Sequence, residues 1–202
     1  MLKPFKISSE VISRISSPIL ILAAAILSNS LTPNLTVAET KQNESIPKVA
    51  FRKAPRLLDI YTTFDRVRSR SAIYYFDITI PEDSGAPLQK VEIELRQGQD
   101  RIKYKLERTV AYLGTHSRRG DRLALETVSQ EEKTEVISVV FANSLPPGTT
   151  FTVGLKPVRN PDFDGIYVFG VTVFPQGENP FGLYLGSRRL YFRRGYDGFF
   201  VH

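Results

Sequence analysis

The segment from Lys90 to Arg96 alternates between charged and apolar side chains, and this alternation constrains the fold more than any other feature of the chain. Its apolar members are Val91, Ile93 and Leu95, and the residues between them carry charges of both signs. Successive side chains of an extended strand point to opposite faces of a sheet. The segment is therefore predicted to be a β-strand with one buried and one solvated face.

The same alternation returns over residues 102–106, after a turn-forming segment at 97–100. The two runs predict a β-hairpin whose strands carry complementary charges. Clusters rich in Pro, Gly, Asn and Asp separate the remaining apolar runs, and no segment after Glu39 has a helical stripe of apolar residues. Further strands are predicted at Ile73–Ile80, Leu123–Val128, Val136–Phe141, Phe151–Leu155, Ile166–Phe174 and Leu183–Phe192.

About eight short strands at this spacing predict an all-β domain, an antiparallel, immunoglobulin-like β-sandwich. The run Ile166–Phe174 is apolar on both of its faces. Such a strand is expected in the middle of a sheet that is covered on both sides, by a second sheet or by a packed loop.

Residues 1–38 resemble a signal peptide. Lys3, Lys6 and Arg14 make a basic start, an aliphatic run follows, and small residues end at Ala38. We expect cleavage there, a flexible tether over 39–48, and one domain over 49–202. An uncleaved amphipathic anchor is the alternative. Export would place the protein in the periplasm or at the cell surface, with the thylakoid lumen as a further possibility, and away from nucleic acid.

The chain has no cysteine and two histidines, His116 and His202. Disulfides, lipidation at cysteine, thiolate metal sites and cysteine nucleophiles are therefore excluded. His116 lies in a glycine-flanked loop at 114–120 and is expected to face solvent. The clustered glutamates lie on a charged strand face or in a turn, where water solvates them, and no glycine-rich phosphate loop precedes a helix. No catalytic constellation is found, and no organic cofactor is expected.

Side-chain oxygens recur at Asn160, Asp162 and Asp164, directly before Gly165. This spacing matches the first half of a calcium loop of the EF-hand type, in which alternate oxygens and a sharp glycine turn surround the cation. The second half differs, because Val171 stands where the bidentate glutamate is required. The same residue types also form ordinary turns between strands. Calcium is therefore a hypothesis, and with it a calcium-assisted carbohydrate-binding module.

Aromatic and arginine residues gather toward the C-terminus, in a chain with a formal net charge of +6. Tyrosine faces can stack on the apolar side of a sugar ring, and guanidinium groups can bind anionic polymers. A solvated strand face is the alternative interpretation. The candidate partner-binding residues are Tyr184, Arg188, Arg189, Tyr191, Arg193 and Arg194, with Tyr196, Phe199 and Phe200 beyond them.

A series of short motifs resembles a cyanobacterial family of exported proteins that is known as a domain of unknown function. The resemblance covers about 140 residues, from Phe51 to roughly Tyr191, and it implies export but no activity and no catalytic residue. The motifs are Phe51-Arg52-Lys53-Ala54-Pro55, Tyr75-Phe76-Asp77-Ile78-Thr79-Ile80-Pro81, Gly85-Ala86-Pro87-Leu88, Pro147-Gly148-Thr149, Asn160-Pro161, Gly165-Ile166-Tyr167-Val168-Phe169-Gly170-Val171 and Leu183-Tyr184-Leu185-Gly186.

Two functions from different classes follow. The first is a non-enzymatic binding module of the cell envelope or periplasm, with a protein or a polysaccharide as its partner. The second is a small secreted hydrolase. An enzyme requires a pocket on which polar or acidic residues converge, whereas a binding module can use a flat, partly apolar surface. The scarcity of histidine and the absence of cysteine favour the binding module.

Overall fold

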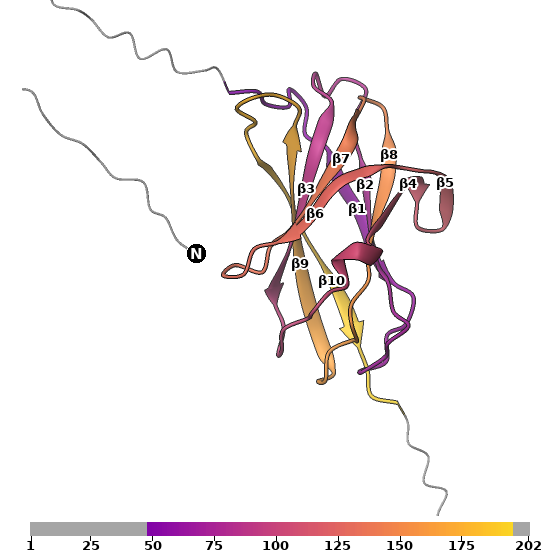
Figure 1. Cartoon of the computed structure of the whole chain (residues 1–202). Helices are drawn as coiled ribbons and strands as arrows, with labels where there is room; N and C mark the ends of the chain where they lie inside the picture. Colours follow the sequence, from indigo (N-terminus) through magenta and orange to yellow (C-terminus); the bar gives the residue numbers. More distant parts are fainter. Residues whose placement is uncertain (1–47, 196–202) are drawn as a thin grey trace, which may run out of the picture. The chain divides into compact units, whose positions relative to one another are not determined.

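The computed structural model describes residues 48–195 as two antiparallel sheets of five strands each (Figure 1). One sheet has the order β1-β2-β8-β4-β5 and the other the order β10-β9-β3-β7-β6. The predicted all-β, immunoglobulin-like sandwich is confirmed, with ten strands instead of about eight. The strands are β1 (Arg56–Thr62), β2 (Tyr74–Thr79), β3 (Leu88–Gln97), β4 (Val110–Thr115), β5 (Arg118–Arg122), β6 (Leu125–Gln130), β7 (Ile137–Leu145), β8 (Thr150–Leu155), β9 (Gly165–Pro175) and β10 (Leu183–Phe192).

The core lies between the two sheets and is rich in aromatic rings. Tyr74 of β2 packs edge-on against Phe169 of β9, with ring centroids 5.9 Å apart. Phe141 of β7 and Phe151 of β8 form a second T-shaped pair at 5.4 Å. Each such pair adds about 0.5–1.5 kcal/mol to the burial of its rings. These contacts join the sheets without a disulfide.

The predicted hairpin between 90–96 and 102–106 is wrong. β3 pairs with β7 on one side and with β9 on the other, so both of its edges are occupied. Residues 102–106 instead form one isolated bridge, Tyr104 with Pro157, and then enter a short 3₁₀-helix, η1 (Leu106–Arg108). Their alternation still has a physical meaning, because Ile102 is buried and Tyr104 and Leu106 pack against the core.

β9 is an internal strand, as predicted, but within residues 48–195 no second sheet covers its outer face. Tyr167, Phe169, Val171 and Val173 point into the core and are fully buried. The opposite face is covered in part by long side chains of neighbouring strands, such as Lys90, whose Nζ lies 3.7 Å from the centroid of the Phe174 ring. The prediction therefore holds for one face only.

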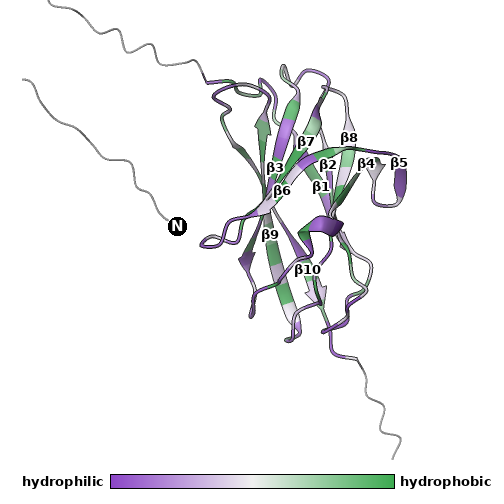
Figure 2. Cartoon of the chain, viewed as in Figure 1, coloured by the Kyte–Doolittle hydropathy of each residue, from purple (hydrophilic) through white to green (hydrophobic). Residues whose placement is uncertain are grey.

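Three strands, β1, β4 and β5, were not predicted, and β4 and β5 change the exposure of their sheet. β5 is hydrophilic throughout (Figure 2). The β4–β5 turn reaches β2, because the backbone N–H of His116 donates to Oδ1 of Asp77 at 2.8 Å. The central strands β2 and β8 are buried on both faces.

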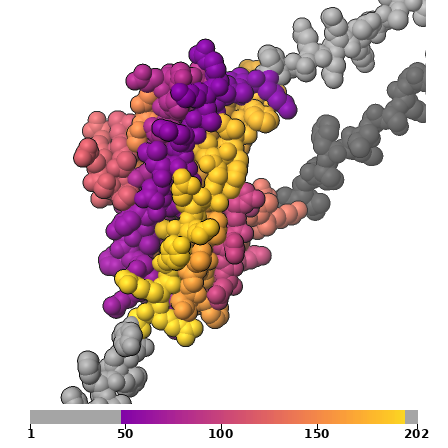
Figure 3. All heavy atoms as spheres, turned by 180° about the vertical axis from the view of Figure 1, so that it is seen from behind, coloured from indigo at the N-terminus to yellow at the C-terminus, as the bar shows by residue number. Residues whose placement is uncertain are grey.

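The edge strands β1 and β10 lie side by side although they belong to different sheets (Figure 3). They run in parallel and are joined beyond their ends by a bridge between Arg66 and Arg193. Each has a register shift, between Leu57 and Asp59 in β1 and between Tyr184 and Gly186 in β10. Such bulges twist an edge away from regular pairing with another chain.

The predicted signal peptide (1–38), most of the predicted tether and the C-terminal Tyr196, Phe199, Phe200 and His202 lie outside the described residues. Within residues 48–195, no helix is long and apolar enough to span a membrane.

Candidate binding surface

Strand β10 presents Arg189 and Tyr191 on the outer face of its sheet. Their partners in the ladder are Val168 and Ile166, which alternate with the buried Tyr167 and Phe169 and therefore point outward. Tyr191 is 60% exposed, and Ile166 is 45% exposed. Folding leaves these side chains in solvent instead of adding them to the core.

Tyr184 reaches the same outer face at the other end of β10. It pairs with Thr172 before the bulge, is 46% exposed, and lies under the guanidinium of Arg96, whose Cζ is 5.0 Å from the ring centroid. Gly170 makes room for this stack, because a Cβ there would lie 2.7 Å from Cδ of Arg96 and 3.1 Å from the Tyr184 ring. We call Tyr184, Arg189 and Tyr191 the β10 strip.

The other three predicted arginines are engaged in contacts that fasten the fold. Arg188 lies between the edge strands, where its Nη2 donates to the Leu57 carbonyl at 3.2 Å. Arg193 pairs with Asp65 through Nε at 2.9 Å, and Arg194 pairs with Asp164 at 2.8 Å. Three of the six predicted residues thus share one surface, and the others connect loops and edges.

A shallow groove of about 450 Å³ runs between β1 and β10, next to the β10 strip. One wall is formed by residues 60–63 of β1 and its following loop, and the other by Arg189, Leu190 and Tyr191. Tyr61, which is 44% exposed, extends the aromatic surface across the groove. The sequence analysis did not predict this neighbourhood, since β1 was not predicted as a strand.

Tyr61 also belongs to a cluster around His116, which lies in a turn between β4 and β5 as predicted, but whose side chain is only 21% exposed instead of facing solvent. The imidazole Nδ1 lies 2.7 Å from Oδ2 of Asp77, whose side chain is only 3% exposed. The ring stacks on Tyr61 at 4.5 Å and on Tyr75 at 6.4 Å. No local pattern around His116 could reveal this cluster, because its partners come from β1 and β2.

The three oxygens of the calcium hypothesis point to different partners. Oδ1 of Asn160 accepts from the Tyr74 hydroxyl at 2.8 Å, and its amide donates to two backbone carbonyls. Asp162 binds Arg159 at 2.7 Å and Arg68 at 3.1 Å. Asp164, as described above, binds Arg194. In the part of the chain that the structure describes, no three acidic or histidine side chains converge on a point that could hold a metal ion.

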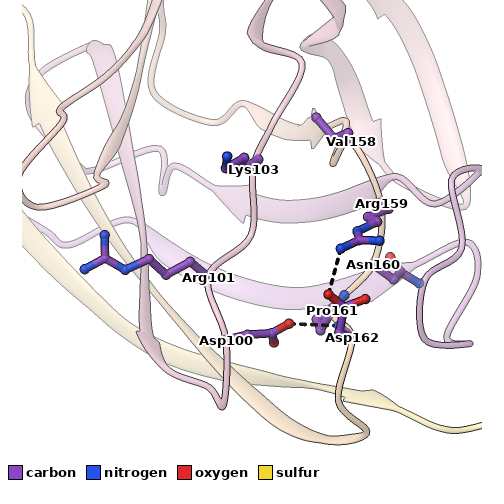
Figure 4. A pocket seen from close by; sticks show the side chains of 8 residues that line it. All are labelled: Asp100, Arg101, Lys103, Val158, Arg159, Asn160, Pro161 and Asp162. Carbon is purple, nitrogen blue, oxygen red and sulfur yellow. Dashed lines mark hydrogen bonds and ion pairs between the residues drawn. The ribbon is translucent and has the colours of Figure 1, made fainter.

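A cavity of about 190 Å³ beside Asp162 is lined by Arg101, Lys103 and Arg159 (Figure 4). Asp100 faces Asp162 across it and accepts the Asp162 backbone N–H at 2.8 Å, while Arg101 points away. These cationic neighbours oppose the entry of a cation. Calcium binding stays a prediction, and it would require Asp162 to leave its two arginines.

Residues 48–192 match the sequence model of a protein family described as "Protein of unknown function (DUF2808)". The chain belongs to the DUF2808 family. The resemblance predicted for residues 51–191 is thereby confirmed at the level of the family. No curated protein matches the DUF2808 chain.

Three solved β-sandwich structures show weak similarity to the DUF2808 chain. A collagen-binding domain of a Staphylococcus aureus adhesin is 9% identical, with a TM-score of 0.36, and covers 74% of this chain and 100% of its own. The collagen-binding subdomain of the Enterococcus faecalis surface protein ACE is 9% identical, with a TM-score of 0.39 and coverages of 67% and 96%. A cohesin module of a Clostridium perfringens family 33 glycoside hydrolase is 16% identical, with a TM-score of 0.37 and coverages of 73% and 100%. These scores are too low to transfer a ligand to the DUF2808 domain.

Two arrangements on the described surface of the DUF2808 domain stand out, the His116–Asp77 pair and the β10 strip. The His116–Asp77 pair is the arrangement closest to a catalytic dyad, yet within residues 48–195 no hydroxyl lies within hydrogen-bond distance of its Nε2. The imidazole stacks on the Tyr61 ring and binds Asp77, which connects the β4–β5 turn to β1 and β2. The β10 strip offers exposed aromatic faces and a guanidinium on a rigid sheet.

Proposed function

We propose that this protein is a non-enzymatic binding module of the cell envelope that holds a protein or polysaccharide partner along the β10 strip. The supporting observation is the exposure of Tyr184 and Tyr191, at 46% and 60%, on the same face of one strand. Large aromatic side chains gain free energy when a partner covers them, and Tyr also keeps a hydroxyl for hydrogen bonding. The intervening Arg189 adds a fixed charge.

The strip is also preorganised. Its residues stand on a paired strand, and Arg96 holds the Tyr184 ring from above. A rigid surface loses little conformational entropy when it binds. The signal-like residues 1–38 support an exported location, in the periplasm, at the cell surface or in the thylakoid lumen.

The test is retention of the purified mature chain, Glu39–His202, on envelope material from the organism that makes it. A double variant, Tyr184→Ser with Tyr191→Ser, should reduce retention at least about thirtyfold, because truncated aromatic anchors each cost about 1 kcal/mol or more. Tyr112→Ser is the matched control, since Tyr112 lies on the outer face of the other sheet. Melting temperatures ensure that each variant is folded. Equal retention of the native chain and the double variant would remove the β10 strip from the proposal.

A further inference from the structure

The arginines around the β10 strip are not neutralised by carboxylates. The ion pairs of residues 48–195 include neither Arg96 and Arg189, on the outer face of this sheet, nor Arg188 at its edge. Arg188 donates only to the carbonyls of Leu57 and Ser187, and Arg96 contacts the Tyr184 ring. A guanidinium that binds a carbonyl keeps its full positive charge.

One carboxylate on this outer face, that of Glu94, is also without an ion-pair partner among the described residues. Glu94 lies on β3 opposite Gly170. The unpaired guanidinium groups of Arg96 and Arg189 thus outnumber this carboxylate and leave the surface positive. Arg193 and Arg194, which the sequence places in the same basic cluster, contribute nothing to this excess because Asp65 and Asp164 neutralise them.

The floor of the surface between the two tyrosines is low. Ser187 pairs with Gly170 there, and neither residue has a long side chain. Tyr184 and Tyr191 are separated by about 20 Å along the strand. An extended chain of rings can therefore lie on the strip, with its apolar faces on the tyrosines and an acidic group on Arg189.

We propose that the partner on the β10 strip is an acidic polysaccharide, a chain of sugar rings that carries carboxylate or sulfate groups. This inference rests on the proposed function and specifies its ligand. Charge complementarity selects an acidic partner, and bidentate guanidinium–carboxylate contacts suit uronic acids. The separate, flat tyrosine faces suit sugar rings better than a protein, whose anchor side chains require deep, desolvated pockets.

The experiment is titration calorimetry of the mature chain with four defined polymers. Polygalacturonate supplies acidic sugars, and its fully methyl-esterified form supplies the same rings without charge. Dextran sulfate replaces carboxylate by sulfate, and poly-L-glutamate supplies carboxylates without sugar rings. We expect binding to polygalacturonate or dextran sulfate, and affinity at least about tenfold lower for the esterified chain and for polyglutamate.

The matched variants are Arg189→Gln and Arg118→Gln. Arg189→Gln should weaken binding to the acidic polysaccharide about tenfold, whereas Arg118→Gln, on the exposed edge strand β5, should not change it. Equal binding of the esterified chain or of polyglutamate would overturn the inference. If none of the polymers binds but retention on envelope material still depends on Tyr184 and Tyr191, the inference falls and the proposed function stands. If no polymer binds and retention on envelope material does not depend on Tyr184 and Tyr191, both the inference and the proposed function are wrong.

Discussion

At the scale of single residues, three phenols link the stability of the domain to alkaline pH. Burial is the main cause that raises the pKa of Tyr74, Tyr104 and Tyr167 above the ordinary value of 10.0. The hydroxyl of Tyr167 also donates to Asp100, which raises its pKa further. Folded phenols then stay protonated at a pH at which unfolded phenols ionise.

The stabilisation from these tyrosines is fully present below pH 10 and is lost as the pH rises toward their folded pKa values. We expect the free energy of unfolding to fall above pH 10, by up to about 1.4 kcal/mol per pH unit for each phenol. Urea denaturation between pH 8 and about 11.5 measures the free energy of unfolding, and tyrosine absorbance over the same range measures the ionisation of the phenols. A folded domain in which every tyrosine ionises near pH 10 would contradict the expectation.

Gly154 supports a second residue-scale prediction. A Cβ at this position would lie 2.8 Å from the Tyr75 ring and 3.0 Å from a methyl group of Val110. Gly154→Ala should therefore destabilise the domain by about 1–3 kcal/mol, as overpacking does in a rigid interior. Gly120→Ala is the control, because its Cβ would meet Leu113 at 3.4 Å, an ordinary contact. Equal urea midpoints for the two variants would show that the Tyr75 ring can move aside without a loss in the free energy of unfolding.

At the scale of elements, the β4–β5 hairpin depends on His116. His116→Ala would leave the nearly buried carboxylate of Asp77 with one hydrogen bond, from the backbone N–H of residue 116. We expect a loss of about 1–3 kcal/mol in the free energy of unfolding and faster amide exchange in β4 and β5. Ser117→Ala, one residue further along the same turn, should have little effect. Unchanged exchange in His116→Ala would mean that the hairpin is held by other contacts.

The elements also separate what the sequence could predict from what it could not. β3, β7 and β9 each have a long apolar face and were predicted. β1 was not predicted because its bulge places Leu57 and Ile60 in the core, and this spacing of three departs from the alternation with period two that identifies a strand. β5 was not predicted because all of its residues are exposed, so it has no apolar face in the sequence. The hairpin predicted with residues 102–106 was wrong because an extended segment that packs on the core has alternating apolar residues whether or not it pairs with a neighbouring strand.

At the scale of the whole molecule, sheet order decides which predicted site residues act together. Arg188, Arg193 and Arg194 are indistinguishable from Arg189 in the sequence, since their partners on β1, in the loop after it and before β9 are distant along the chain. Tyr61 could join the surface only once β1 and β10 were known to be adjacent. Local patterns therefore predicted the sandwich and the three residues of the β10 strip, but not which predicted arginines are engaged elsewhere, the groove or the His116 cluster.

The sandwich also bears on the predicted export of the protein. Its described core is held by apolar and aromatic packing, and the chain has no cysteine to oxidise, so folding after export requires no oxidising compartment. We expect the protein isolated from its own cells to begin at Glu39, and its melting temperature to be the same with and without a thiol reductant. N-terminal sequencing and thermal denaturation are the two measurements. An Ala38→Gln variant, which removes the small residue before the cleavage point, should accumulate with the leader attached. A mature protein that still begins at Met1 would instead support the uncleaved anchor.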